Sequence, residues 1–419
     1  MLGFGCLTNW TRFGSRGASC AGEAGESPAL TRSGDVAHGH QPECLRRMHP
    51  KSPLISPPRY AEEGQRMTLS TLHASASRPA LASKTTLRPR AVALTAVALV
   101  ASALLASPAQ AQPASDDRLA GRTAAGWLNR QFVDGTRLQT TFDGTAYDDA
   151  GLTLDAVLAF AAAKTNAVRS DAAMNWVSQP ATLAGYIGSG TESYAGAHAK
   201  VALALQVTNR NPRAVAGRDV IAELAALQQD SGRLSDASQW GDFSNAFGQS
   251  FGAIALKRAG LAVPAAKASG YLQAQACADG SVPISFEMPT CAGDADATAL
   301  AIQAFSATGR TAAAARASSW LSAYVKSAGA INANTAGLAA AALDRTGNAA
   351  ADTARELIRA NQQGCATAFT RRAAIAYTLP YDASAAPRAT AQAILGLAGA
   401  NLATLRSSGS IAHAPTLAC

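Results

Sequence analysis

Polar and aromatic side chains gather before and within the first turns of six short apolar segments of this 419-residue chain. Because helix starts present free N–H groups and a positive dipole end, such a gathering suits a ligand that carries oxygen acceptors or negative charge. Asp and Asn are also preferred helix N-caps, so capping alone is an alternative explanation for any one of them. The candidate ligand-binding residues are Tyr147, Asp149, Tyr194, His198, Trp240, Asn245, Phe247, Gln249, Thr298, Asn332, Asn334, Tyr381 and Arg388.

Titratable side chains in the same segments suggest further chemistry. Asp155 and Lys200 are predicted to lie at equal depth on neighbouring helices, as an ion pair that is either structural or catalytic. His198 and His413 are the only histidines after residue 111, too few to support a zinc site or a Ser/His/Asp triad. No glycine-rich phosphate loop of the P-loop or Rossmann type is present in the sequence. We therefore expect neither a metal nor a cofactor.

The six apolar segments are rich in Ala and Leu, and their length and composition predict buried helices. More polar helices lie before or between them, with apolar residues three and four positions apart, as in helices with one face in solvent. Six inner and six outer helices predict an all-α fold, an (α/α)6 toroid of six helical hairpins; an open solenoid is the alternative. The inner segments are residues 151–160, 196–205, 247–256, 296–305, 334–343 and 388–397.

Equal offsets from the last residues of these segments predict equal depth in the ring, because Cβ directions repeat with the helix geometry. The layers seven, nine and eleven positions before the last residues are largely polar, whereas the last residues themselves are Phe or Leu. The sequence therefore predicts a polar mouth at the helix starts and an apolar barrel further in.

The chain divides into three regions. Residues 1–66 lack apolar periodicity and are predicted to be disordered, or to be upstream sequence if Met67 is the true start. Residues 67–111 have the form of a signal peptide, with basic residues, an apolar run too short to span a membrane, and a small-residue cleavage site ending at Ala111. We expect cleavage there, secretion, no remaining membrane span, and a single toroid domain over residues 112–419.

Cleavage would change the charge and the cysteine content. Of the 36 basic and 28 acidic residues, 12 and 6 precede residue 112, which leaves 24 and 22 and a net charge of +2 instead of +8. No basic surplus then remains to indicate a nucleic-acid partner. Four cysteines would remain, an even number in an oxidising compartment. We expect Cys277 to pair with Cys291, since they flank one loop, and Cys365 to pair with Cys419.

One string of residues resembles a family of enzymes. DADATALAIQAF, residues 294–305, is similar to the DxDDTA segment of squalene-hopene and related protonating terpene cyclases. The resemblance implies a toroid fold and gives Asp296 the position of the family's general acid, with Asp294 beside it. The last aspartate of the motif is replaced here by Ala297.

A second set of strings resembles the helical domain of cobalamin carriers, the transcobalamin and intrinsic factor group. It begins with GAHAKVALALQ and ends with GAINANTAGLAAAALDRTG, in the same order, within residues 196–347. The zinc-dependent protein prenyltransferases resemble this chain in fold alone. These likenesses imply the terpenoid cyclase and protein prenyltransferase toroid superfamily and a ligand of isoprenoid or corrinoid type.

Two functions follow as alternatives. The first is a secreted toroid protein of the prenyltransferase and squalene-oxidase repeat type that binds a partly apolar small molecule in its central cavity. The second is an atypical class II terpene cyclase, an isomerase with Asp296 as general acid. We favour binding, because a strong acid needs a hydrogen-bonded partner that the loss of the last aspartate removes in part. Export would also separate the protein from cytoplasmic isoprenoid precursors.

Overall fold

The computed structural model describes residues 113–327 and 331–419. The predicted disordered segment and signal peptide, with its cleavage site, lie outside these residues. Six inner helices carry the six apolar segments of the sequence, and each begins near the predicted start. They are α2 (Ala150–Ala163), α5 (Ala195–Val207), α7 (Ala246–Arg258), α9 (Ala295–Ala307), α11 (Ala333–Leu343) and α13 (Ala386–Leu397).

Outer helices cover the inner ones, and the predicted hairpins are all present within the described residues. The outer layer consists of α1 (Ser115–Asn129), α3 (Ala167–Val177), α4 (Pro180–Ile187), α6 (Val220–Ala226), α8 (Ala262–Ala274), α10 (Thr311–Ser327) and α12 (Ala350–Ala360). A short 3-10 helix, η2 (Asp344–Thr346), follows α11. Two small antiparallel ladders precede inner helices: β1 (Gln139–Phe142) with β2 (Thr145–Asp148), and β3 (Val282–Pro283) with β4 (Gly293–Asp294).

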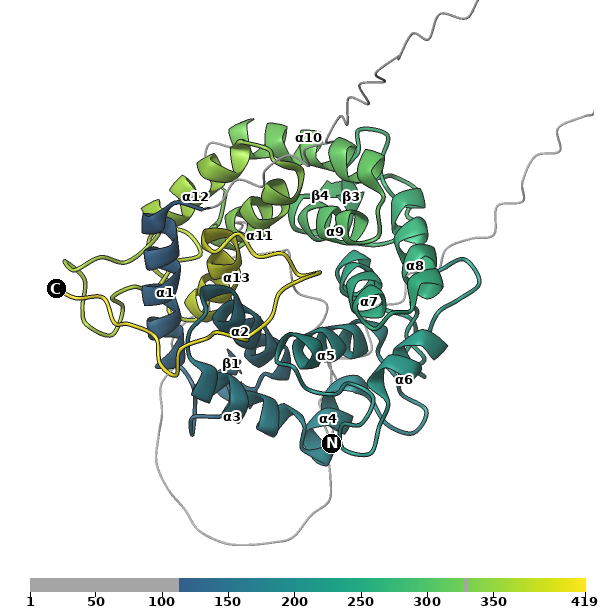
Figure 1. The fold of residues 1–419 in the computed structure, drawn as a ribbon, viewed down its shortest axis with the longest axis horizontal. Coiled ribbons are helices and arrows are strands. Elements are labelled where there is room, and N and C mark those ends of the chain that lie inside the picture. The colour runs from purple at the N-terminus through teal and green to yellow at the C-terminus, as the bar shows by residue number, and fades with distance from the viewer. Residues whose placement is uncertain (1–112, 328–330) are drawn as a thin grey trace, which may run out of the picture. The chain divides into compact units, whose positions relative to one another are not determined.

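The inner helices form a closed ring. Each contacts the next one in the order of the chain, and α13 contacts α2, which closes the circle (Figure 1). An open solenoid would leave the first and last inner helices apart, so the fold is the predicted (α/α)6 toroid. An outer helix lies between successive inner helices in the chain and returns it to the starting end of the ring. The inner helices are therefore parallel to one another, and their N-termini lie at the same end of the ring.

Apolar side chains between the two layers hold the ring together. The residues that end the six apolar segments are all buried: Phe160, Leu205, Leu256, Phe305, Leu343 and Leu397. They belong to one buried hydrophobic cluster with residues of the outer helices, such as Trp127 on α1 and Leu321 on α10. Burying a side chain of this size stabilises a fold by about 1.5–3 kcal/mol.

Small residues let neighbouring inner helices approach closely. A Cβ added to Gly248 on α7 would lie 2.8 Å from the Cα of Gly196 on α5. A Cβ added to Gly337 on α11 would lie 2.3 Å from the carbonyl oxygen of Gln392 on α13. Both distances are shorter than van der Waals contact, which explains why these helices are rich in Ala and Gly.

The chain after α13 crosses the end of the ring where the inner helices finish (Figure 1). Gln303 on α9 binds it in two places, since its amide donates to the carbonyl of Ala400 and its oxygen accepts from the N–H of Leu402, both at 3.1 Å. Further on, the N–H of Ser407 donates to the carbonyl of Val207 on α5 at 2.8 Å. This C-terminal segment, residues 398–419, therefore covers the end of the ring opposite the helix starts.

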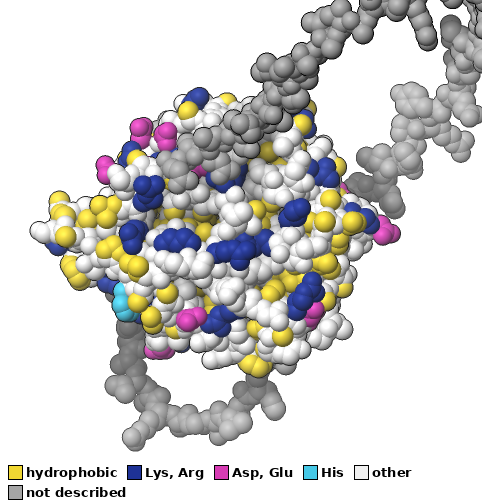
Figure 2. Space-filling model, viewed as in Figure 1, with side chains coloured by type: hydrophobic (Ala, Val, Ile, Leu, Met, Phe, Trp, Pro, Cys, Tyr) yellow, Lys and Arg dark blue, Asp and Glu magenta, His cyan; other side chains and the backbone are white. Residues whose placement is uncertain are grey.

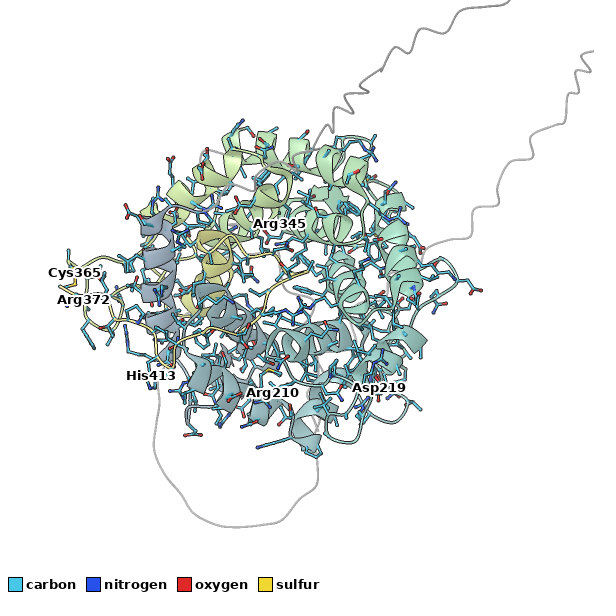
Figure 3. All side chains as sticks on the ribbon, viewed as in Figure 1. Arg210, Asp219, Arg345, Cys365, Arg372 and His413 are labelled. Atoms are coloured by element: carbon cyan, nitrogen blue, oxygen red, sulfur yellow. A yellow bond between two sulfur atoms is a disulfide. The ribbon has the colours of Figure 1, made fainter. Side chains whose placement is uncertain are left out.

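Both predicted disulfides are present. Cys277–Cys291 closes a loop of 14 residues that contains β3, and Cys365–Cys419 links the last residue of the C-terminal segment to the loop after α12. Cys365 lies at the outer edge of the ring in Figure 3. The second bond thus holds the far end of the C-terminal segment against the outer layer.

Candidate functional site

One polar layer of the inner helices binds the backbone of the segments that lead into them. Four side chains of this layer are fully buried, and each accepts a hydrogen bond from a backbone N–H 15 or 16 residues earlier, at 2.8–3.0 Å. The side chains are Thr153, Gln249, Thr298 and Thr390. Gln249 also donates to the carbonyls of Gly232 and Ala268. Gln249 and Thr298, expected from the sequence to line the mouth, are therefore engaged in holding the fold.

His198 occupies the same layer on α5. Its Nδ1 lies 2.9 Å from the carbonyl oxygen of Tyr194 and its Nε2 lies 3.0 Å from a carboxylate oxygen of Glu223 on α6. Arg218 donates to the same carboxylate at 2.7 Å. Both ring nitrogens are thus occupied within a buried link between an inner and an outer helix, which leaves neither for a ligand.

Four side chains of the outermost layer are helix N-caps, as the capping alternative predicted. Each accepts a hydrogen bond from a backbone N–H in the first turn of its own helix, which accounts for its residue type without a ligand. The four caps are Asp149 on α2, Asn245 on α7, Asp294 on α9 and Asn332 on α11. Tyr194 does not cap α5; instead the carboxylate of Asp236 accepts from the N–H of Ala195 at 2.7 Å.

Two charged centres remain on the inner helices after these structural roles are assigned. In the first, Lys200 Nζ lies 2.7 Å from Asp155 Oδ1, and both side chains are nearly buried. Arg388 on α13 reaches the other oxygen of Asp155 at 3.5 Å and the N-cap Asp149 at 3.1 Å. The predicted ion pair between α2 and α5 is confirmed. It is part of a balanced cluster of two cations and two carboxylates, because burial of an unpaired charge is costly.

The second centre is Asp296 on α9. In the ring of six inner helices, α9 lies opposite α2, which carries Asp155. Its Oδ2 accepts a hydrogen bond from the amide of Asn334 on α11 at 3.1 Å. Its Oδ1 is buried and makes no well-aligned hydrogen bond among the described residues, although the Thr335 side chain lies near enough to oppose the rise in its pKa. Burial, and secondly the charge of Asp294, raise the pKa of Asp296 to about 7. This carboxyl is therefore partly protonated at neutral pH.

Two tyrosines that the sequence did not single out lie near Asp296. Burial and then the charge of Asp296 raise the pKa values of Tyr324 on α10 and Tyr377 in the loop before α13. Tyr324 is 37% exposed and Tyr377 is 40% exposed, so each offers part of its ring to a ligand. Trp320 stacks on Tyr324 with ring centroids 5.4 Å apart. In the sequence, the only signal of this aromatic group is that Trp320 and Tyr324 lie four positions apart on a polar helix.

The other predicted aromatic candidates lie in segments that lead into inner helices. Tyr147 on β2 and Trp240 before α7 are more than half exposed. Tyr381, before α13, is half-buried beneath the guanidinium of Arg371, 4.9 Å from its ring centroid. Phe247, in the first turn of α7, is partly buried against the core. These residues belong to the same end of the ring as Asp296.

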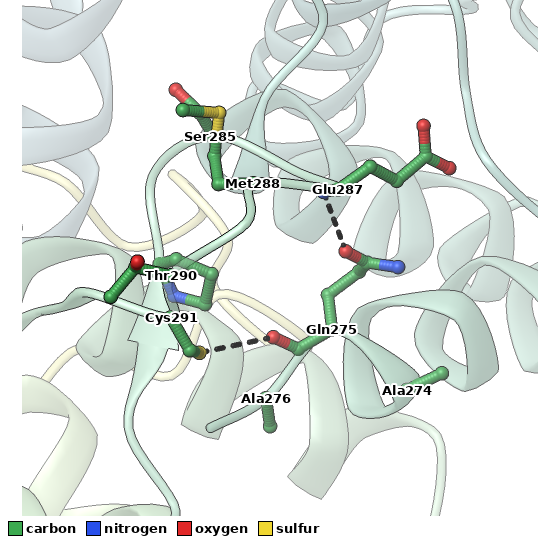
Figure 4. Close-up of a pocket in the computed structure, with 9 residues that line it drawn as sticks. Ala274, Gln275, Ala276, Ser285, Glu287, Met288, Thr290 and Cys291 are labelled. Atoms are coloured by element: carbon green, nitrogen blue, oxygen red, sulfur yellow. Dashed lines mark hydrogen bonds between the residues drawn. The ribbon is translucent and has the colours of Figure 1, made fainter. Parts of the chain in front are cut away.

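A pocket of about 220 Å³ adjoins the loop closed by Cys277–Cys291 (Figure 4). Gln275, Glu287, Met288 and Thr290 line it, and the N–H of Glu287 donates to the side chain of Gln275 at 3.0 Å. It is smaller than the pockets that usually hold drug-sized ligands, about 300–1,000 Å³. A larger pocket of about 500 Å³ lies at the other end of the ring, beside the C-terminal segment.

The part of the chain that the structure describes contains no group of three or more His, Cys, Asp or Glu side chains arranged to hold a metal ion. His413, the second histidine considered from the sequence, lies exposed on the C-terminal segment (Figure 3). Among the described helices, none combines the length and apolar character needed to cross a membrane.

Comparison with known proteins identifies the fold. No protein-family model matches the chain, and no curated protein matches it. A solved structure of an unsaturated glucuronyl hydrolase specific for heparin is similar to it, with a TM-score of 0.50 and 12% identity, over 67% of this chain and 96% of that one. A protein from Actinoplanes is similar with a TM-score of 0.50 and 16% identity, over 68% of this chain and 99% of that one. The shared feature is the α/α toroid. At such low identity these likenesses establish the fold alone.

Proposed function

We propose that this chain is an exported toroid protein that binds a small, partly apolar molecule at the end of the ring where the inner helices begin. The buried Oδ1 of Asp296, which makes no well-aligned hydrogen bond among the described residues, carries the proposal together with the two partly exposed tyrosines near it. Leaving a buried acceptor unsatisfied costs about 1–3 kcal/mol. A hydroxyl or amine of a ligand would remove that cost.

The side chains around Asp296 indicate the polarity and charge of the ligand that would bind there. Tyr324 and Tyr377 offer partly exposed aromatic rings, which favour an apolar or flat ligand. The cluster of Asp149, Asp155 and Arg388 is balanced in charge with Lys200, so it does not demand an ionic ligand. An isoprenoid alcohol and a corrinoid, the two classes suggested by the sequence, both combine apolar surface with hydrogen-bond donors.

Acid catalysis at Asp296 is the second candidate, and the raised pKa of Asp296 favours it. A carboxyl with a pKa of about 7 holds a transferable proton at neutral pH. General acid catalysis is most effective when the pKa of the acid lies near the pH at which the enzyme works. Oδ1 is the oxygen that would carry this proton, since Oδ2 accepts from Asn334. A raised pKa also makes this carboxyl a weaker acid, so it suits the protonation of an activated group better than the protonation of the plain carbon–carbon double bond of the cyclase alternative. The hydrolase of similar fold is named for an unsaturated sugar, which supplies a second probe.

Native mass spectrometry of the protein purified from its own host tests the binding proposal. A small molecule that copurifies with the wild type is expected. Asp296→Asn should weaken binding of this molecule less than tenfold. The amide oxygen would still accept from Asn334, and the amide NH2 would donate to the ligand hydroxyl, which would then act as acceptor instead of donor. Asp296→Leu should weaken binding more than tenfold. A wild-type protein that carries no small molecule and binds neither farnesol nor cobinamide would contradict the proposal.

Turnover assays separate the two candidates. Squalene, geranylgeranyl diphosphate and an unsaturated glucuronide are incubated with the wild type and with Asp296→Asn, and products are analysed by chromatography with mass detection. If the protein is a binder, neither variant forms a product. A product formed by the wild type and lost in Asp296→Asn would establish catalysis instead, because the amide has no proton to transfer.

A further inference from the structure

The pocket of about 500 Å³ lies at the end of the ring opposite Asp296 and has a basic lining. It is formed by the last turns of α5 and α7, the loop after α5 and the C-terminal segment. Figure 2 shows this face, where basic side chains lie over the middle and acidic ones lie mostly near the edge. The lining residues that the argument uses are Gln206, Arg210, Arg258 and Arg406.

Three arginines supply the charge of this basic pocket, and only one of them has a carboxylate partner. Arg210, in the loop after α5 and labelled in Figure 3, donates to Asp171 on α3 at 2.9 Å. Arg258 donates only to the backbone carbonyls of Leu402 and Leu405, each at 2.9 Å. The guanidinium of the exposed Arg406 pairs with no carboxylate in the described part of the chain.

A positive charge remains after the local negative groups are counted. The carboxylate of Asp171 neutralises one arginine. The C-terminal ends of α5 and α7 each contribute about half a negative charge. About one net positive charge is left in a concave site, where partial desolvation strengthens its effect on a ligand.

Two buried polar atoms of the lining residues lack partners and would gain them from a ligand that carries a hydroxyl as well as a charge. The Nε of Arg258 and the Oε1 of Gln206 are both buried without a partner in the described chain. The first would donate to an anionic oxygen, and the second would accept from a hydroxyl. Burial and the neighbouring charge of Arg406 lower the pKa of Arg258 to about 10, as expected for two close cations that lack a counter-ion.

We propose that this pocket is a second binding site, one that takes a small hydroxylated anion such as a sugar phosphate, a sulfated sugar or a uronic acid. The anionic group binds the exposed guanidinium of Arg406, which can give two parallel hydrogen bonds to phosphate, sulfate or carboxylate. Arg258, already bound to Leu402 and Leu405, adds its positive charge. A hydroxyl of the same molecule donates to Gln206. The volume of the pocket, about 500 Å³, accommodates one or two sugar rings.

Isothermal titration calorimetry at low ionic strength tests this site on the full protein. The probes are glucose 6-phosphate, a monosulfated glucose and glucuronate, with inorganic phosphate, inorganic sulfate and neutral glucose for comparison. At least one sugar anion should bind saturably and more tightly than glucose or the matching inorganic ion. The tightest of the three identifies the anionic group.

Charge variants assign the binding to the pocket. Arg406→Gln should weaken it at least fivefold, whereas Asp171→Asn should strengthen it two- to fivefold by releasing Arg210. Lys267→Gln, an equal change of charge on the exposed surface of α8, should leave it unchanged, and so should Asp296→Asn. Equal weakening by Arg406→Gln and Lys267→Gln would overturn the proposal, as would no preference for the sugar anions over glucose. Neither result would bear on binding near Asp296.

Discussion

The carboxyl of Asp296 makes a quantitative prediction about the stability of the fold. Because its pKa is raised from 3.8 to about 7, the folded chain holds a proton that the unfolded chain releases at lower pH. The stability that this group contributes is therefore complete below about pH 4 and is lost as the pH rises through 7. Asp296→Asn removes the titration and hence this dependence on pH.

The size of the effect follows from the two pKa values. Each pH unit between them corresponds to about 1.4 kcal/mol of unfolding free energy. Between pH 5 and pH 8, Asp296 should thus contribute roughly 2–3 kcal/mol in favour of the lower pH. An asparagine can be accommodated at this position, since its carbonyl oxygen can take the place of Oδ2 and accept from Asn334.

Urea unfolding of the wild type and of Asp296→Asn at pH 5 and pH 8 measures this contribution. Other groups titrate in the same range, but they are common to both proteins and cancel in the difference between them. The change from pH 5 to pH 8 should be roughly 2–3 kcal/mol more destabilising for the wild type than for Asp296→Asn. Asp116→Asn, on the exposed surface of α1, serves as the control and should behave as the wild type. Identical pH dependence in Asp296→Asn would refute the assignment of a raised pKa.

Two further predictions concern the elements that hold the ring. Thr390→Val should reduce the unfolding free energy by about 1–3 kcal/mol, because it leaves the buried N–H of Ile375 without its acceptor. Thr404→Val, at an exposed position, is the control. An equal effect of the two substitutions in urea unfolding would contradict this role of Thr390. Replacing Cys365 and Cys419 by Ser opens a loop of 54 residues and should cost about 4 kcal/mol in the same assay, whereas a loss below about 1 kcal/mol would show that the C-terminal segment is held by other contacts.

The main features of the fold were predictable from the sequence because they depend on local composition and repetition. Buried Ala-rich helices, N-caps and helix spacing are properties of short segments, and they gave the six inner helices and the closed ring. The pairing of Asp155 with Lys200 was predicted from equal depth on neighbouring helices and is confirmed at 2.7 Å. The two disulfides followed from an even number of cysteines, two of which flank one loop.

The direction of side chains around the inner helices was harder to predict. Equal offset from the helix end gives depth, but it does not give the face of the helix. Residues two positions apart differ by about 200° around a helix, so the layers that contain Thr298 and Asp296 cannot share one face. Asp296 and Leu300, four positions apart, do share a face. This explains why Thr298 binds backbone outside the ring whereas Asp296 contacts a neighbouring inner helix.

Contacts between segments that the repeat does not relate to one another were not predictable. Tyr324 and Tyr377 approach Asp296 only because an outer helix and a loop meet at one end of the ring. The basic pocket exists because the C-terminal segment brings Arg406 next to Arg258, 148 residues earlier in the chain. Nothing in the sequence around Arg258 or around Arg406 indicates that the two side chains lie close together.

The Cys277–Cys291 bond connects the expected oxidising compartment with the proposed site at Asp296. The loop that it closes contains β3, which pairs with β4 immediately before α9. The N–H of Val282 on β3 also donates to Thr298 within α9 at 2.8 Å. These contacts fix the first turn of α9, where Asp294 caps the helix and Asp296 faces Asn334. A loop closed by a disulfide thus holds in place the carboxyl on which both functional candidates depend.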